Sequence, residues 1–184
     1  DADVLYKVYR DNIDKGSGET VVLGAGTYNY VLNVTGGQNY SANSSMNVKT
    51  LNVNKANSQT SLVFDKTSPQ TYGTLITPIC SVISGVGTTE LRMNGNVINS
   101  GVALNLGAGN YSFNCSLASS QNFSYSENVS NFVINKATLN LTFLANGGNS
   151  NLSLIHPQQV NITAIASAGT VGLDRNVASV LSEN

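Results

Sequence analysis

The sequence predicts an all-β protein made of antiparallel β-sandwiches in tandem, and three observations lead to that prediction. The segment Leu23–Tyr30 is repeated as Leu106–Phe113, 83 positions later, so that Leu-Gly-Ala-Gly-Xaa-Tyr occurs twice. Helical periodicity is nearly absent, and short alternating apolar segments are separated by Gly, Asn and Ser. Two cysteines, Cys80 and Cys115, lie in two of these segments.

The repeat defines three predicted domains. Gln38–Ser41 matches Gln121–Ser124 at the same offset, and Val53–Ala56 matches Ile134–Ala137 at an offset of 81. A period of this size fits a small domain and is too long for a solenoid unit. We therefore expect the end part of one domain at residues 1–55, a complete domain at 56–136 and the first part of a third domain at 137–184.

The first copy has four candidate strands, separated by turn residues. They correspond to the third, fifth, sixth and seventh strands of a seven-stranded unit, at Val4–Arg10, Glu19–Leu23, Thr27–Val34 and Met46–Asn54.

The complete copy has seven candidate strands, at Ser61–Asp65, Thr74–Ile83, Thr88–Met93, Asn96–Ile98, Gly101–Leu106, Asn110–Leu117 and Val129–Asn135. Seven short strands in about 80 residues fit an immunoglobulin-like sandwich. The last copy has the first three strands of such a unit, at Leu139–Phe143, Gln159–Ala166 and Thr170–Asn176.

The cysteines and two tyrosines are assigned roles by their positions in the strands. Strand alternation places Tyr111, Phe113 and Cys115 on one face, and Cys80 lies in the second strand. A pair 35 residues apart in the second and sixth strands matches an inter-sheet disulfide, and the alternative is two buried free thiols. Tyr28 and Tyr111 both follow Ala-Gly-Xaa, which predicts tyrosine corners, with simple core packing as the alternative.

Each incomplete copy taken alone would expose an apolar face and unpaired strand edges. Neighbouring sequence of a longer polypeptide would complete it, and the opening Asp1-Ala2-Asp3, without a signal peptide, is compatible with such an excerpt. The alternative is that residues Leu139–Asn176 of one copy complete the Val4–Asn54 half of the next, which would build a filament.

The repeated motifs resemble those of bacterial and archaeal immunoglobulin-like repeat domains of large surface proteins. The resemblance rests on Leu-Gly-Ala-Gly-Xaa-Tyr, Gln-Asn-Tyr/Phe-Ser and Val/Ile-Asn-Lys-Ala, and the Asn-rich style is closer to archaeal members. It implies an extracellular stalk, adhesin or surface filament without catalytic residues. Trp is absent from the chain, so the core Trp of antibody domains is missing and Leu91 or Met93 is expected to fill its volume.

Composition excludes some classes of function. Charged residues make up 10% of the chain, whereas Asn, Ser, Thr and Gln supply 69 of its 184 residues. A net charge of −1 without a basic run argues against nucleic-acid binding. No apolar run reaches the length of a membrane span.

The chain is rich in N-glycosylation sequons, which predicts a secreted glycoprotein. Random placement would give about five, and the alternative to glycosylation is accidental sequons in an Asn-rich chain. The ten candidate sites are Asn33, Asn39, Asn43, Asn110, Asn114, Asn122, Asn128, Asn140, Asn151 and Asn161. Alternation predicts that Asn114 and Asn140 point away from the core.

No catalytic constellation is found in the sequence. The single histidine, His156, has no partner motif, and no cofactor-binding loop or metal-ligand spacing is present. The oxygen-rich stretch with Asp11, Asp14 and Glu19 is a weak calcium candidate, because hairpin loops are built from the same residues.

The sequence therefore predicts a non-enzymatic, extracellular structural or adhesive protein. Its expected partners are other copies of itself or neighbouring repeats, and surface glycans or other cells. Short junctions at Lys55-Ala56 and Lys136-Ala137 are expected to limit hinge motion. The alternative from another class is a carbohydrate-binding accessory module of a secreted enzyme, which specific binding on a glycan array would reveal.

Overall fold

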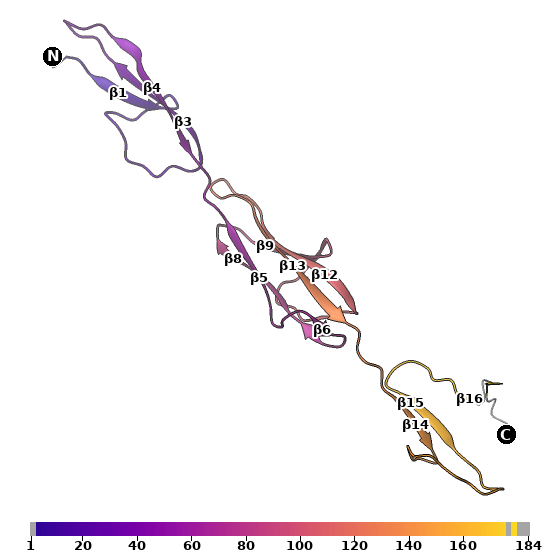
Figure 1. The fold of residues 1–184 in the computed structure, drawn as a ribbon. Helices are drawn as coiled ribbons and strands as arrows, with labels where there is room; N and C mark the ends of the chain where they lie inside the picture. Colours follow the sequence, from indigo (N-terminus) through magenta and orange to yellow (C-terminus); the bar gives the residue numbers. More distant parts are fainter. Residues whose placement is uncertain (1–2, 176–177, 180–184) are drawn as a thin grey trace. The chain divides into compact units, whose positions relative to one another are not determined.

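The computed structural model describes residues 3–175 and 178–179, and these residues form strands and loops without any helix. The chain divides into two compact units, residues 1–135 and 136–184. The prediction of an all-β protein with antiparallel sheets is confirmed (Figure 1). The division into three domains stays a prediction.

The first sheet lies in residues 6–53 and has four strands in the order β2-β1-β3-β4. They are β1 (Tyr6–Arg10), β2 (Ile13–Asp14), β3 (Gly26–Val34) and β4 (Asn43–Val53). Asp11 and Asn12 form the two-residue turn between β1 and β2 with φ of 49° and 68°. Asp and Asn tolerate this left-handed conformation better than most residues, which is why they end β1 here.

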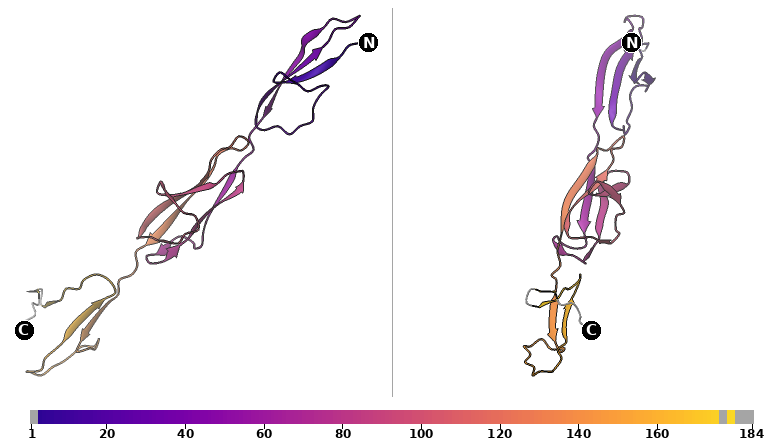
Figure 2. Two further views of the ribbon diagram at one scale, coloured as in Figure 1. Left: turned by 180° about the vertical axis from the view of Figure 1, so that it is seen from behind. Right: turned by 90° about the vertical axis from the view of Figure 1, so that its right-hand side faces the viewer.

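The central part of the chain forms a sandwich, with strands β5 (Gln59–Phe64), β6 (Gln70–Thr71), β7 (Leu75–Ile76), β8 (Pro78–Ser84), β9 (Thr89–Met93), β10 (Asn96–Ile98), β11 (Leu104–Asn105), β12 (Gly109–Leu117) and β13 (Ser126–Asn135). One sheet has the order β10-β9-β12-β13-β6, in which β6 runs parallel to β13. The pairs β5-β8 and β7-β11 form two smaller sheets. Figure 2 shows this part from two further sides.

The core of the sandwich lies between β5-β8 and the five-stranded sheet. Phe113 is fully buried, and its ring packs edge-on against Phe64 with ring centroids 5.0 Å apart. Phe132 is also buried and contacts the same Phe64 ring at 4.9 Å. The predicted disulfide between Cys80 and Cys115 is confirmed, and it joins β8 to β12 beside these rings. The alternative of two free thiols is therefore wrong.

Leu91 and Met93, the residues expected to fill the volume of the missing Trp, both belong to this core. Leu91 is 2% exposed, and Met93 packs against the buried cluster from its edge.

The second unit contains β14 (Leu141–Ala145), β15 (Ile162–Ala166), β16 (Asp174–Arg175) and β17 (Ala178–Ser179). The strands β14 and β15 form an antiparallel pair, with Phe143 opposite Ala164. At the end of β14, Asn146 accepts a hydrogen bond from the backbone N–H of Asn161 at 2.7 Å. This contact fixes the register of the pair at the end where the long loop leaves it.

The same strand registers occur in the first sheet, in the β14-β15 pair and in the central sandwich. In the first sheet Val8 pairs with Leu32, and 83 residues later Leu91 pairs with Cys115. Tyr28 pairs with Leu51 in the way that Tyr111 pairs with Phe132. The antiparallel pair β14-β15, which we call the hairpin, has the register of the β5-β8 pair. Phe143 lies opposite Ala164 as Leu62 lies opposite Cys80. We call residues at such matching positions counterparts.

Several predicted strands are divided or shorter than expected. Thr74–Ile83 is divided at Thr77 into β7 and β8, and Gly101–Leu106 contains only the two residues of β11. Gln159–Ala166 begins as a strand only at Ile162. Of the predicted strand Thr170–Asn176, only Asp174–Arg175 is a strand, and Asn176 lies outside the described residues.

The predicted strand Glu19–Leu23 is wrong, because these residues form no strand. The reason is visible in the central sandwich. There the counterpart of Val21, Leu104 in β11, pairs with Ile76 in β7. Residues 3–54 contain no strand equivalent to β7, so Val21 has no partner strand.

The stability of the central sandwich is expected to fall in acid partly through Asp65. The backbone N–H of Thr77 donates to Asp65 Oδ1 at 2.6 Å, and this bond, with a smaller contribution from Lys66, lowers the pKa of Asp65. A lowered pKa means that the stabilisation is present above the ordinary value near 3.9 and is lost as the pH falls through the lower folded value.

The variant Asp65→Asn should therefore lose less stability between about pH 5 and pH 2 than the unmodified chain. Asn146, its counterpart in the hairpin, already makes this hydrogen bond with an amide side chain. Urea unfolding at several pH values measures the effect. An identical pH dependence in both proteins would contradict it.

Candidate functional site

Tyr28 and Tyr111 make the same hydrogen bond at the start of equivalent strands. Tyr28 Oη donates to the carbonyl of Gly24 at 2.8 Å, and Tyr111 Oη donates to the carbonyl of Gly107 at 3.0 Å. Each bond spans four residues and fixes the Leu-Gly-Ala-Gly turn against the strand that follows. The glycine motif is thus a structural turn, in the first sheet and in the sandwich alike.

One face of the first sheet is apolar. No part of residues 3–135 covers this face in the way that β5-β8 covers the core of the central sandwich. Val8, Tyr30 and Leu32 on this face are half-buried, whereas their counterparts Leu91, Phe113 and Cys115 are buried. The largest contrast is on β4, where Leu51 is 42% exposed and its counterpart Phe132 is 1% exposed.

A polar cluster lies at the turn end of this face. Arg10 Nη1 donates to Glu19 Oε1 at 2.8 Å, and Tyr30 Oη donates to the same oxygen at 2.7 Å. The hydrogen bond to the Glu19 carboxylate raises the pKa of Tyr30 above its ordinary value. The side chains of Arg10 and Glu19 are only 17% and 16% exposed, and Lys15 Nζ lies 3.7 Å from Glu19 Oε2, so one carboxylate pairs with two cations at this end of the face.

The structure does not bring the three calcium candidates together. Asp11 Oδ1 accepts the backbone N–H of Asn29, Asp14 binds the ammonium of Lys7 at 2.6 Å, and Glu19 binds Arg10. Within residues 3–175 and 178–179 there is no group of three or more His, Cys, Asp or Glu side chains that could hold a metal ion.

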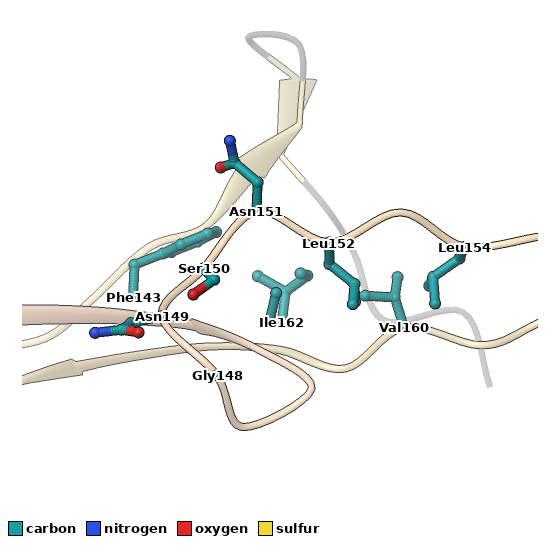
Figure 3. Close-up of a pocket in the computed structure, with 10 residues that line it drawn as sticks. Phe143, Gly148, Asn149, Ser150, Asn151, Leu152, Leu154, Val160 and Ile162 are labelled. Carbon is teal, nitrogen blue, oxygen red and sulfur yellow. The ribbon is translucent and has the colours of Figure 1, made fainter.

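The β14-β15 hairpin has a second open apolar face, which forms a shallow pocket with the loop between the strands (Figure 3). In the picture Leu152, Leu154 and Val160 turn toward one another, and Phe143 and Ile162 continue the row. Phe143 is 56% exposed and Val160 is 51% exposed. The counterpart of Val160 is Ile76, which is 0% exposed in the central core.

The linker that precedes the central sandwich is held by the Gln121–Ser124 loop. Lys55 Nζ donates to the carbonyl of Ser120 at 2.8 Å, and the backbone of Ala56 exchanges hydrogen bonds with Asn122 and Ser124. Asn122 Oδ1 also accepts the backbone N–H of Ala25 at 2.8 Å. The two repeated motifs therefore meet, the glycine turn of one copy against the Gln-Asn-Phe-Ser loop of the next.

This contact was not foreseen from the sequence, although a signal for it was present. The motifs around Ala25 and Asn122 recur together in both copies, and neither Ala25 nor Asn122 belongs to the buried core. Repeated polar residues without a place in the core are candidates for contacts between repeats.

The variant Asn122→Ala should speed the hydrogen exchange of the Ala25 amide by about a factor of ten, because that amide loses its acceptor. The Ala56 amide should be unaffected, since its acceptor is the backbone carbonyl of residue 122. Exchange rates measured by NMR test both statements. Asn110→Ala, at another exposed sequon, is the control, and equal acceleration in it would contradict the assignment.

The ten sequons differ in how accessible their side chains are. Asn33 and Asn114 are half-buried, and Asn114 Nδ2, the atom that would carry a glycan, donates to Glu127 at 3.0 Å. Asn114 points away from the core, because Phe113 and Cys115 on either side of it are buried. The exposed sites are Asn39, Asn43, Asn110, Asn122, Asn128, Asn140, Asn151 and Asn161.

The single histidine lies apart from these features. His156 is exposed and occupies the turn before Pro157 in the long loop between β14 and β15. The described part of the chain contains no helix that is long and apolar enough to cross a membrane.

Comparisons with family models, with curated proteins and with solved structures each found no match for the chain. The function is therefore argued from the geometry of the chain alone. Two features carry that argument, the repeated strand registers and the open apolar faces.

Proposed function

We propose that this chain is part of a non-enzymatic, extracellular structural protein, in which tandem immunoglobulin-like domains form a surface stalk or fibre. The observation that carries the proposal is the recurrence of one strand register in residues 6–53 and in the central sandwich. The tyrosine hydrogen bonds and the left-handed turns recur together with this register. Their recurrence supports a domain repeated in series.

The central sandwich supports the immunoglobulin-like assignment. In that assignment β8, β9, β12 and β13 are the second, third, sixth and seventh strands of the fold. The neighbours β9, β12 and β13 form one sheet, and a disulfide joins the second strand to the sixth. Tyr111 then takes the position of the tyrosine corner at the start of the sixth strand.

A stalk needs junctions that limit bending, and the linker contact supports this role. Lys55, Ala56 and Asn122 connect the linker to the loop of the following sandwich through short hydrogen bonds. The sequence Lys136-Ala137 repeats the linker after the sandwich, so the same type of junction is expected there. Glycans at exposed sequons would keep this weakly charged surface soluble.

Immunoelectron microscopy of intact native cells tests the proposal. An antibody against the central sandwich should label the cell surface or appendages without permeabilisation, and enzymatic deglycosylation should lower the mass of the labelled polypeptide. Labelling that requires permeabilised cells would overturn an extracellular role. The carbohydrate-binding alternative has no observation in the structure that favours it.

A filament assembled between subunits is a second candidate, and the open apolar faces of residues 3–54 and 140–166 favour it. Each face has the composition of a sandwich interior but the exposure of a surface. The two faces belong to complementary halves of one domain. A specific form of this candidate follows.

A further inference from the structure

We propose that the open face of the first sheet binds the β14-β15 hairpin of a second copy of this chain, in the register used by the central sandwich. The inference rests on the proposed function, because it assumes that both incomplete copies belong to the same repeated fold. It adds the partner, the faces that meet and the pairs of residues that touch.

The central sandwich is the template for this interface. There a sheet containing β9, β12 and β13 packs on the β5-β8 pair. Residues 6–53 supply the equivalent of the first layer, and residues 141–166 supply the equivalent of the second. Both layers keep the registers of the template although each lacks the other.

The hairpin matches its template in the middle of the strand pair and at its end. Leu62 and Cys80 are opposite each other in β5-β8, as Phe143 and Ala164 are in β14-β15. The terminal hydrogen bond from Thr77 to Asp65 is repeated from Asn161 to Asn146. The side chains on the open face therefore have the spacing of those that pack in the central core.

Residues buried in the template are exposed in the two halves. Pro78 is fully buried, whereas its counterpart Ile162 is 38% exposed. The same contrast holds for Ile76 with Val160 and for Phe132 with Leu51. Removing such apolar side chains from water is favourable by about 25 cal/mol per Å², so the joined halves are favoured over the separate ones.

The facing residues also compensate in size. The disulfide pair Cys80 and Cys115 is replaced by Ala164 and Leu32, in which a small residue faces a large one. In β14, Ala145 is the counterpart of Phe64 and has no ring. Phe143, two positions earlier, is the counterpart of Leu62 and supplies a ring instead. Two positions along a strand is the same face, so the apolar volume is kept.

Two segments without strand structure have the same explanation. Val21 and Val22 are 50% and 99% exposed, and Val160 is exposed in the other half. Their template counterparts are in β11 and β7, where Leu104 pairs with Ile76. Joining the halves places Val21 opposite Val160 and provides the partner strand that each segment lacks.

Charge does not oppose the association. From residue 137 to 173 the sequence has no Asp, Glu, Lys or Arg. On the first sheet, Glu19 pairs with Arg10 at 2.8 Å and with Lys15 at 3.7 Å. Lys49 lies opposite Tyr30 on the same face and is exposed. An uncharged apolar hairpin therefore brings no like charge against the charged residues of this face.

A pair of introduced cysteines tests the register. Leu32→Cys and Ala164→Cys in one chain place thiols at the counterparts of Cys115 and Cys80, which are bonded in the template. Under mild oxidation we expect a ladder of disulfide-linked dimers and longer chains that collapses on reduction. In an equal mixture of ¹⁴N- and ¹⁵N-labelled chains, about half of the cross-linked peptides should contain both labels.

The matched control pairs Ala164→Cys with Val48→Cys, because Val48 lies on the opposite face of β4 from Leu51 and is exposed. It should give no ladder. No cross-link in the first variant, or cross-links of which none contains both labels and which therefore formed within one chain, would overturn the inference.

Sedimentation of the unmodified chain tests the association without depending on whether a variant folds. Its mass should rise with concentration, and Phe143→Asp should weaken the association at least tenfold while the central sandwich unfolds at the same denaturant concentration. A chain that stays monomeric at millimolar concentration would overturn the inference. Surface labelling of cells would still stand or fall independently, so the two failures are distinguishable.

Discussion

Replacing Cys80 with Ala and Cys115 with Leu is expected to lower the free energy of unfolding of the central sandwich by about 4 kcal/mol. The disulfide closes a loop with a sequence separation of 35 residues, and a loop of that length restricts the unfolded chain strongly. The new residues copy Ala164 and Leu32, which occupy the same positions in the incomplete copies. Together, the two new residues should therefore change the packed volume of the core only slightly.

Denaturant unfolding of the variant and of the unmodified chain measures this difference. Reduction of the unmodified chain should cause a fall of similar size, because both treatments remove the same constraint. If the reduced and oxidised chains had equal stability, the bond would contribute nothing and the expectation would be wrong.

The parts of the fold that could be predicted from the sequence have local signals. Alternation around Phe113 and Cys115 identified a strand with one buried face, and the separation of Cys80 from Cys115 identified the disulfide. Turn residues predicted a turn between β9 and β10, and Asn94 in that turn has the left-handed conformation, with a φ of 49°. Each of these signals spans only a few residues or a single pair.

The parts that could not be predicted depend on a distant partner. Gln70–Thr71 is a strand only because β13 runs parallel beside it, and its own sequence has no alternation that would reveal this. Glu19–Leu23 has the sequence of a strand but lacks its partner. The linker contact of Asn122 with Ala25 joins residues 97 positions apart, and no local pattern contains that information.

The same dependence explains why the first sheet keeps its form. Within the first sheet, β3 and β4 pair over Gly26–Val34 and Asn43–Val53, and the backbone hydrogen bonds of these long strands need no second layer. The second layer supplies burial of side chains. A sheet without a second layer can therefore keep the register of the central sandwich and still present an apolar face to solvent.

Truncating the centre of the core is the second large effect expected. Phe113→Ala should destabilise the central sandwich by about 4 kcal/mol, because Phe113 is fully buried and contacts Phe64 across the two layers. Its removal leaves a cavity that the disulfide beside it prevents from closing. Thermal or denaturant unfolding measures the loss.

Two variants control for the position of the truncated side chain. Val129→Ala removes an exposed side chain on the outer face of β13 and should cost less than about 0.5 kcal/mol. Leu51→Ala removes a side chain from the open inner face of the first sheet, the counterpart of buried Phe132. In dilute solution its effect should be below about 1.5 kcal/mol, since much of Leu51 is already in water.

The dependence on protein concentration distinguishes the buried core of the central sandwich from the open face of the first sheet. The effect of Phe113→Ala should be the same at every protein concentration, because both layers around Phe113 belong to one chain. The effect of Leu51→Ala should grow as copies associate, because only then is Leu51 removed from water. Equal, concentration-independent losses for the two variants would mean that the first sheet is never completed by another copy.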